Sequence, residues 1–228
     1  MSSRFLALAA AVALPASAAL AESAQAPTLK LKLSRFAKGN SGVTIDANFG
    51  TGADGKARIL TATKMSLPKG SVFNTKAVAR CAATQDQINA AGGASKACPP
   101  ASEIGSATAE AIIGDGTTPT EFSGSIWNYA SGPLVELDIG DTPAYYISST
   151  IKANSVLFDL SNAPSLNAHA TKVTVKIDNA GTRKKPFLRT PKTCPKGKWS
   201  ASGLDTFSDG TTATVKTTVP CKRTKKKS

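Results

Sequence analysis

The sequence predicts an all-β protein, an antiparallel β-sandwich with a barrel as the alternative, that carries one short helix in a disulfide loop. Three observations lead to this fold class. Apolar residues alternate with polar ones at period two in many stretches, as in half-buried strands. Short segments rich in Gly, Pro and Asn separate these stretches without intervening helices, which favours antiparallel sheets. The chain of 228 residues also contains four cysteines, an even number that suits disulfides.

The predicted strands follow one another from the first third of the chain to its end. In the first, Leu29, Leu31 and Leu33 alternate with lysines, and a turn at 39–42 connects it to the second strand as a hairpin. A second turn, at 152–154, separates two stretches rich in β-branched and aromatic residues. The stretches assigned as strands are 29–33, 43–49, 59–67, 107–113, 135–139, 145–151, 155–160, 173–177 and 211–219.

One segment departs from the strand pattern. Thr84 is followed three residues later by Gln87, which is the spacing of a capping box, and Gly92-Gly93 can end the helix that begins there. A helix of this length is marginal in water on its own. Its position between Cys81 and Cys98 gives a reason for it to persist, because a disulfide would clamp both of its ends.

The cysteines permit three pairings, and we favour Cys81 with Cys98 and Cys194 with Cys221 because each pair closes one local loop. Zinc is the competing interpretation of four cysteines. No C-x-x-C spacing occurs and His169 is the one histidine, so we assign no metal and no cofactor.

The amino terminus has the features of a secretory leader. Arg4 precedes an apolar run from Phe5 to Leu14, and A-x-A sites allow cleavage after Ala21 or Ala26. The run is too short to span a bilayer, and no transmembrane segment is predicted. We therefore expect residues 1–26 to be a signal peptide, and residues 27–221 to form the folded part in an extracellular or envelope-associated location. A division into two sub-domains near Pro119 is an alternative to a single domain.

Turn and cysteine positions carry one resemblance. The first half contains Leu67-Pro68-x-Gly70, Cys81 and Cys98-Pro99-x-x-Ser102-x-Ile104-Gly105, and the second contains Leu188-Arg189-Thr190-Pro191-x-x-Cys194-x-x-Gly197-x-Trp199 and Pro220-Cys221. This pattern resembles uncharacterised secreted β-rich proteins of high-GC Gram-positive, actinobacterial-type bacteria. The resemblance implies an exported β-rich module and supplies no catalytic residues.

Positive charge is the strongest functional signal. Twenty-eight Lys and Arg against fifteen Asp and Glu give a formal net charge of +13. One cluster lies at 183–198 and a basic tail ends the chain, which predicts attraction to a cell-wall polyanion or glycan. A solvated surface with no partner is the alternative. No nucleic-acid motif occurs, and aromatic residues do not interleave with the cations. The residues assigned to polyanion binding are Arg183, Lys184, Lys185, Lys222, Arg223, Lys225, Lys226 and Lys227.

The search for an enzyme site yields no catalytic residues. His169 reads as a surface-loop histidine and Trp199 as a core anchor behind Cys194. Glu136 and Asp138 share one face of a strand, which we expect to be exposed and therefore unable to raise a carboxyl pKa. Isolated Asp-Gly turns at 54, 115 and 209, and Asp141, lack the ligand series of a calcium loop.

Two functions remain at this point. The preferred one is a non-catalytic secreted or envelope-associated module that binds polyanionic or carbohydrate polymers through its basic surface. The alternative is a secreted carbohydrate-active hydrolase whose carboxylates come together only in the fold.

Overall fold

The computed structural model describes residues 24–33, 42–114, 116–140, 142–161, 167–178, 180–182 and 184–221. Most of the predicted leader, all of the basic tail at 222–228, and Arg183 lie outside the described residues. No helix in the described part of the chain is long and apolar enough to span a membrane.

Strands make up most of the described chain, and the predicted all-β class is confirmed. Every stretch predicted as a strand overlaps an observed one, whereas β4, β6, β11 and β12 were not predicted. The strands are β1 (Thr28–Leu33), β2 (Val43–Asn48), β3 (Leu60–Ser66), β4 (Val72–Phe73), β5 (Glu103–Ile113), β6 (Thr120–Asn128), β7 (Pro133–Ile139), β8 (Thr142–Lys152), β9 (Ser155–Asp159), β10 (Ala168–Ile177), β11 (Leu188–Arg189), β12 (Lys198–Phe207) and β13 (Thr212–Pro220).

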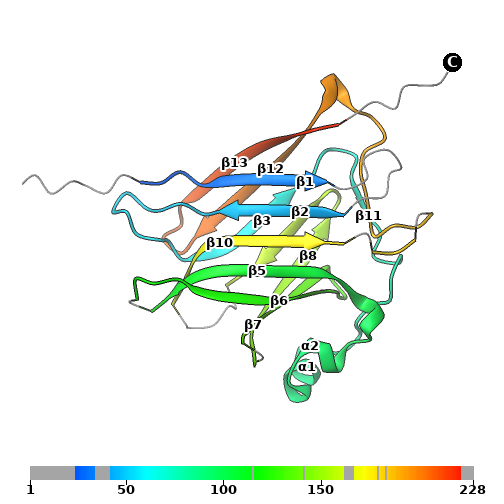
Figure 1. Cartoon of the computed structure of the whole chain (residues 1–228), viewed down its shortest axis with the longest axis horizontal. Coiled ribbons are helices and arrows are strands. Elements are labelled where there is room, and N and C mark those ends of the chain that lie inside the picture. Colours follow the sequence, from blue (N-terminus) through cyan, green and yellow to red (C-terminus); the bar gives the residue numbers. More distant parts are fainter. Residues whose placement is uncertain are drawn as a thin grey trace, which may run out of the picture.

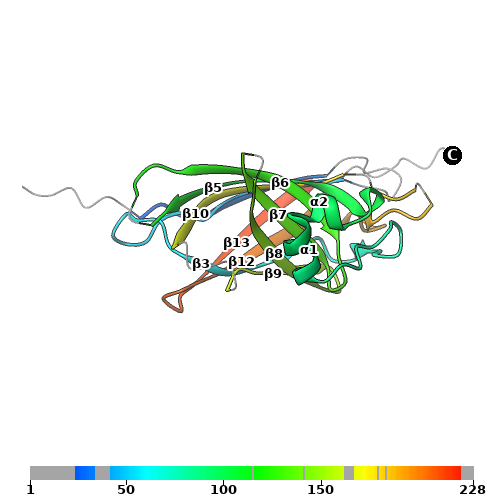
Figure 2. The same ribbon diagram turned by 90° about the horizontal axis from the view of Figure 1, so that it is seen from below.

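Eleven of the described strands form one antiparallel sheet in the order β1-β2-β10-β5-β6-β7-β8-β9-β3-β12-β13. Its two outermost strands, β1 and β13, lie against each other, so the sheet nearly closes as a barrel (Figure 1). From below, the barrel is flattened into two facing layers, with β5, β6 and β10 in one and β3, β9 and β12 in the other (Figure 2). The order of the strands is therefore that of a nearly closed barrel, which was the alternative to the predicted sandwich. Strands β5 and β6, which lie on either side of Pro119 in the sequence, pair with each other within this one sheet.

The alternation seen in the sequence places apolar residues inside the barrel. Leu29, Leu31 and Leu33 of β1 are buried between exposed neighbours, and they pair through the predicted hairpin register with β2, where Leu33 faces Val43. Strand β5 likewise points Ala107 inward, with further alanines at every second position. The main core fills the space between the two layers.

Two of the unpredicted strands, β6 and β12, each contain a glycine. A Cβ on Gly124 of β6 would lie 1.8 Å from the backbone oxygen of Glu136, so only glycine fits there. Gly203 of β12 packs less tightly, because a Cβ there would lie 3.8 Å from Leu29 and Met65 side-chain atoms. These glycines and the neighbouring serines hide the alternation on which strand assignment from sequence depends.

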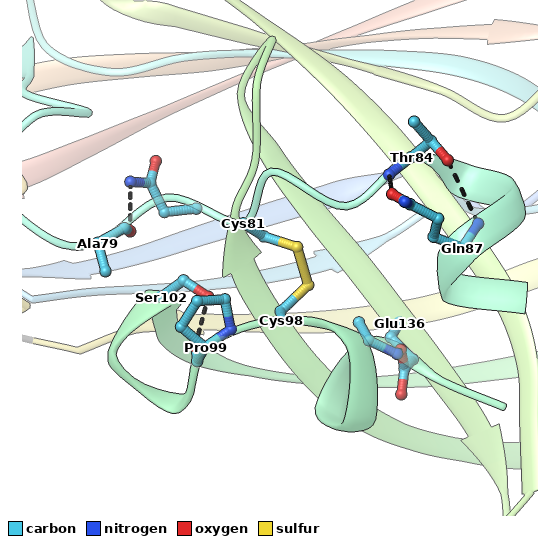
Figure 3. The surroundings of a disulfide bond; sticks show 10 residues. Ala79, Cys81, Thr84, Gln87, Cys98, Pro99, Ser102 and Glu136 are labelled. Atoms are coloured by element: carbon cyan, nitrogen blue, oxygen red, sulfur yellow. Dashed lines mark hydrogen bonds between the residues drawn. A yellow bond between two sulfur atoms is a disulfide. The ribbon is translucent and has the colours of Figure 1, made fainter. Parts of the chain in front are cut away.

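The predicted helix and both predicted disulfides are present. Helix α1 (Gln85–Ala91) begins with the capping box, because the Gln87 amide donates to Thr84 Oγ1 and the Thr84 amide donates to Gln87 Oε1 (Figure 3). It ends at Gly92, whose φ of 72° is left-handed. A second short helix, α2 (Ala94–Ala97), follows before the Cys81–Cys98 disulfide closes the loop.

The clamped helices build a second, smaller core on the outside of the barrel. Ile88 and Ala94 pack with the disulfide against Trp127 of β6 and Leu134 of β7. As a result, β7 is buried on both faces from Pro133 to Leu137, and so is the end of β6, whereas β1 keeps the usual alternation of buried and exposed residues.

Candidate functional site

Two segments of the chain carry many cations and no carboxylate. Between Asp54 and Asp86 there are six Lys and Arg residues and no Asp or Glu. Between Asp178 and Asp205 there are seven Lys and Arg residues and again no Asp or Glu. Only the second segment contains the cluster at 183–198 that was predicted to bind a polyanion.

Strands β4 and β11 pair these two segments with each other. Their antiparallel register sets Leu188 opposite Phe73 and Arg189 opposite Val72. The amide of Asn74 also donates to the Phe187 carbonyl at 2.7 Å. Segments that are more than a hundred residues apart in the sequence thus meet at one end of the barrel, where Figure 1 shows β11.

Buried apolar side chains hold this small sheet in place. Phe187 and Leu188 are fully buried, and the Phe187 ring makes an edge contact with the Phe73 ring at 6.2 Å between centroids. Beneath it, the Asn128 side chain donates to the carbonyls of Thr75 and Ala79 at 2.9 Å, which fixes the loop after β4. The cations around this anchor are therefore displayed on an ordered backbone.

A surface depression of about 180 Å³ lies beside the β4–β11 pair. Lys184, Lys185 and Arg189 line it together with Val72, Phe73 and the neighbouring loop. All three cations are exposed, and Val72 is 40% exposed at the same place. The depression therefore offers three positive groups beside a small apolar surface.

We name the exposed cations that flank β4 and β11 in the chain, together with those of the depression, the basic end. In the described part of the chain, the ion pairs are Lys32–Asp46, Lys172–Glu110 and Lys176–Asp178, and none of them involves the basic end. Its positive charge is thus not neutralised by ion pairs with described carboxylates. The basic end comprises Lys69, Lys76, Arg80, Lys184, Lys185, Arg189, Lys192, Lys196 and Lys198.

The second disulfide joins the carboxyl end of the described chain to the basic end. Cys194 bonds to Cys221, and the Cys221 amide donates to the Gly197 carbonyl at 2.9 Å. Trp199 is buried behind this link and donates from Nε1 to the Thr193 carbonyl at 2.6 Å, which confirms its role as a core anchor. The tail cations at 222–227 lie outside the described residues, but their attachment point is fixed at this end.

No family model, curated protein or solved structure matches this chain. The resemblance to actinobacterial-type secreted proteins stays a prediction.

The expectation that Glu136 is solvent-facing is wrong. Its side chain lies on the outer face of β7, but the disulfide-clamped helices cover that face and leave Glu136 3% exposed. The carboxylate accepts a hydrogen bond from the Ala94 amide at the start of α2 (Figure 3). Burial raises the pKa of Glu136, and nearby Asp138 raises it further, while the backbone amides of Ala94 and Ser95 lower it.

This buried carboxyl group has a structural role in the geometry observed. Asp138, two residues along the same strand, is half-buried, and Asp141 lies outside the described residues. Because α2 covers the Glu136 carboxylate and uses it as a hydrogen-bond acceptor, a substrate has no open path to it. The signal that could have predicted this burial is the disulfide loop, which has to pack its apolar helix face somewhere on the barrel.

The assignment of His169 to a surface loop is also wrong. His169 is half-buried near the start of β10, and its Nδ1 lies 2.7 Å from the Ala57 carbonyl oxygen. In the loop before it, residues 162–166 lie outside the described part of the chain. The imidazole therefore connects a strand to the segment before β3.

The Asp-Gly turns have local hydrogen-bond partners. Asp54 Oδ1 accepts from the Lys56 amide at 3.0 Å, and Asp209 Oδ1 accepts from the amide and hydroxyl of Thr211 at 2.9 and 2.6 Å. The Thr211 hydroxyl is the main cause of the lowered pKa of Asp209. Within the described ranges no group of three His, Cys, Asp or Glu side chains could hold a metal ion, and Asp115 lies outside them.

Proposed function

We propose that this protein is a non-catalytic extracellular or envelope-associated module that binds polyanionic polymers through the basic end. The observation that carries this proposal is the β4–β11 pairing, which brings two carboxylate-free cationic segments together. Neither segment alone would form the basic end. The fold therefore brings together positive charges that are far apart in the sequence.

The chemistry of the basic end suits polymers of phosphate or carboxylate groups. Arg189 can form two parallel hydrogen bonds with one such group, and Lys184 and Lys185 act as point charges beside it. A flexible polymer that places several anions on these cations releases its condensed counterions, which makes binding favourable and sensitive to salt. The β4–β11 depression would hold one anionic group, and the other exposed cations would contact its neighbours along the chain.

Export supports the choice of polymer. The expected leader at 1–26 and the two disulfides both suit an oxidising compartment outside the cytoplasm. In such a location the abundant polyanions are teichoic-type polymers and acidic polysaccharides of the envelope. The tail cations, attached next to the Cys194–Cys221 link, would add a second set of contacts to the same polymer.

The alternative of a carbohydrate-active hydrolase has one observation in its favour. A buried carboxyl group with a raised pKa, such as Glu136, is what a general acid needs. Glu136 is 3% exposed, however, and its carboxylate is hydrogen-bonded to the Ala94 amide, which leaves no room for a glycosidic oxygen. We therefore prefer the polyanion-binding module.

The proposal is tested by binding to purified cell walls over a salt series. Four forms are compared: the mature protein, a form truncated after Cys221, the triple variant Lys184→Gln, Lys185→Gln, Arg189→Gln, and a matched control. The control removes three exposed lysines from β1, β3 and β13, so it has the same net charge as the triple variant. Its substitutions are Lys30→Gln, Lys64→Gln and Lys216→Gln.

We expect the mature protein to bind at low salt and to be released as salt rises. The triple variant should bind more weakly than the control, because the control cations lie away from the depression. Truncation should weaken binding further without abolishing the difference between the two triple variants. If the triple variant and the control bind equally, net charge alone explains the binding, and this result would contradict a site at the basic end.

A further inference from the structure

Two apolar cavities lie side by side inside the barrel, and no residue of the basic end lines either of them. Each has a volume of about 70 Å³. They share a large part of their lining, so they adjoin each other between the two layers. The shared lining residues are Leu60, Ala109, Leu137, Ile147, Leu160, Ala170 and Val173.

Small side chains create this space. Strand β5 turns Ala107, Ala109 and Ala111 inward, and Ala168 and Ala170 of β10 line the cavities beside them. Protein interiors are packed as densely as organic crystals, and unfilled apolar space costs stability. An apolar cavity of this kind stays free of water and can accept an apolar ligand. Antiparallel barrels also provide a precedent, because several hold a small ligand in the interior.

One polar side chain lines this apolar space, and its buried hydroxyl group has no hydrogen-bond partner among the described residues. Tyr145 of β8 lines the second cavity and is 6% exposed. Its hydroxyl group is buried and makes no hydrogen bond with the described residues. The Tyr145 ring is held by an edge contact with Phe122 at 5.8 Å between centroids, so the hydroxyl is carried by a fixed ring. Buried polar groups normally have a partner, and this one therefore indicates a missing acceptor or donor.

We propose that the barrel interior binds a slender, neutral aliphatic molecule with one oxygen, such as a straight-chain alcohol, aldehyde or ester, whose oxygen hydrogen-bonds to the Tyr145 hydroxyl. The apolar lining excludes charged ligands, because a carboxylate or ammonium group there would be desolvated without a counter-charge. The volume of about 70 Å³ in each cavity excludes polycyclic molecules. Burial raises the pKa of Tyr145, so the hydroxyl remains neutral and can donate.

This inference is independent of the polyanion-binding proposal, since it uses neither the basic end nor the tail. The experiment titrates the mature, disulfide-intact protein, labelled at its alanine methyl groups, with 1-hexanol and with n-hexane. Chemical shifts of the cavity alanines report binding of each compound. Three variants accompany the wild type: Tyr145→Phe, the matched control Tyr146→Phe, and the blocking substitution Ala109→Ile. Tyr146 is the neighbour on β8 that packs against the outer core.

We expect both compounds to shift the cavity methyl groups in the wild type. Tyr145→Phe should weaken 1-hexanol binding by roughly five- to tenfold, the range of one hydrogen bond, and leave n-hexane binding unchanged. Tyr146→Phe should bind both compounds as the wild type does. Ala109→Ile should bind neither, and if that variant does not fold, Ala170→Val fills the same shared lining.

Two outcomes would overturn the inference. If neither compound shifts the cavity methyl groups of the wild type, the space does not accept ligands. If Tyr145→Phe binds 1-hexanol as tightly as the wild type, the hydroxyl does not recognise the oxygen.

Discussion

The link between Glu136 and the start of α2 gives a sharp stability prediction. Replacing Glu136 with Ala removes the acceptor of the Ala94 amide, and Ala94 is fully buried. A buried amide left without a partner costs about 1–3 kcal/mol of unfolding free energy. Glu136→Gln keeps an acceptor oxygen at the same place and should avoid most of this loss. Urea unfolding of both variants, with disulfides intact, measures the difference.

The pH dependence of the same variants separates charge from hydrogen bonding. Burial raises the pKa of Glu136 above its ordinary value of 4.5, so the native state holds this proton more tightly than the unfolded state does. As pH rises from about that ordinary value through the raised pKa, the wild type therefore loses stability from this group. Glu136→Gln does not titrate, and its stability relative to the wild type should increase over that pH range.

Asp205 is a second buried carboxyl group whose pKa burial raises, so the wild-type profile contains both contributions. The difference between wild type and Glu136→Gln cancels the Asp205 contribution, because both proteins retain it. Two results would refute the reasoning: Glu136→Ala as stable as the wild type at pH 7, or a Glu136→Gln profile parallel to that of the wild type from pH 4 to pH 7.

Two further predictions concern the scaffold. Replacing Cys81 and Cys98 with Ala opens a loop whose ends are 17 residues apart. The added loop entropy of the unfolded chain should lower the free energy of unfolding by about 3 kcal/mol. Urea unfolding measures this change, and a loss below about 1 kcal/mol would contradict the prediction. Gly124→Ala should destabilise the protein severely, because its Cβ would overlap the Glu136 carbonyl, whereas Gly203→Ala should be tolerated. Thermal unfolding of this matched pair of strand glycines checks the prediction, and equal melting temperatures would contradict it.

The alternation of apolar and polar residues predicted the strands that have one face toward the core and the other toward solvent. In β1, β2 and β10, apolar residues face the core at every second position, so the pattern in the sequence follows directly from burial. In β6 and β12, serines and a glycine interrupt the apolar positions, and at Gly124 the neighbouring strand approaches too closely for any side chain. Those strands are specified by their neighbours in the sheet, which no local pattern reveals.

Glu136 shows a different limit of local reasoning. Its position in β7 was predicted correctly, and its outward direction too, but the outer face was taken to be solvent. The Cys81–Cys98 loop covers that face, and both the loop and its helix had been predicted from the sequence. What the sequence lacked was the docking of one predicted element on another, since that depends on tertiary contacts.

Only part of the basic end was predicted, because the rest of it depends on tertiary contacts. Lys184, Lys185 and Arg189 stand out because they are close together in the chain. Lys69, Lys76 and Arg80 are dispersed, and they join the surface only through the β4–β11 pairing. The cavity beside Tyr145 had no sequence signal beyond the alternating alanines of β5, which are equally compatible with close packing.

The central claim is that the basic end, rather than net charge, binds a polyanion. The most direct measurement is the affinity for poly(glycerol phosphate) across a salt series, for the mature protein and the two triple variants. If Lys184, Lys185 and Arg189 each contact one phosphate, their removal should reduce the slope of log K against log salt by about 2 to 3. The matched control should keep the wild-type slope. Identical slopes for both triple variants would contradict a localised site.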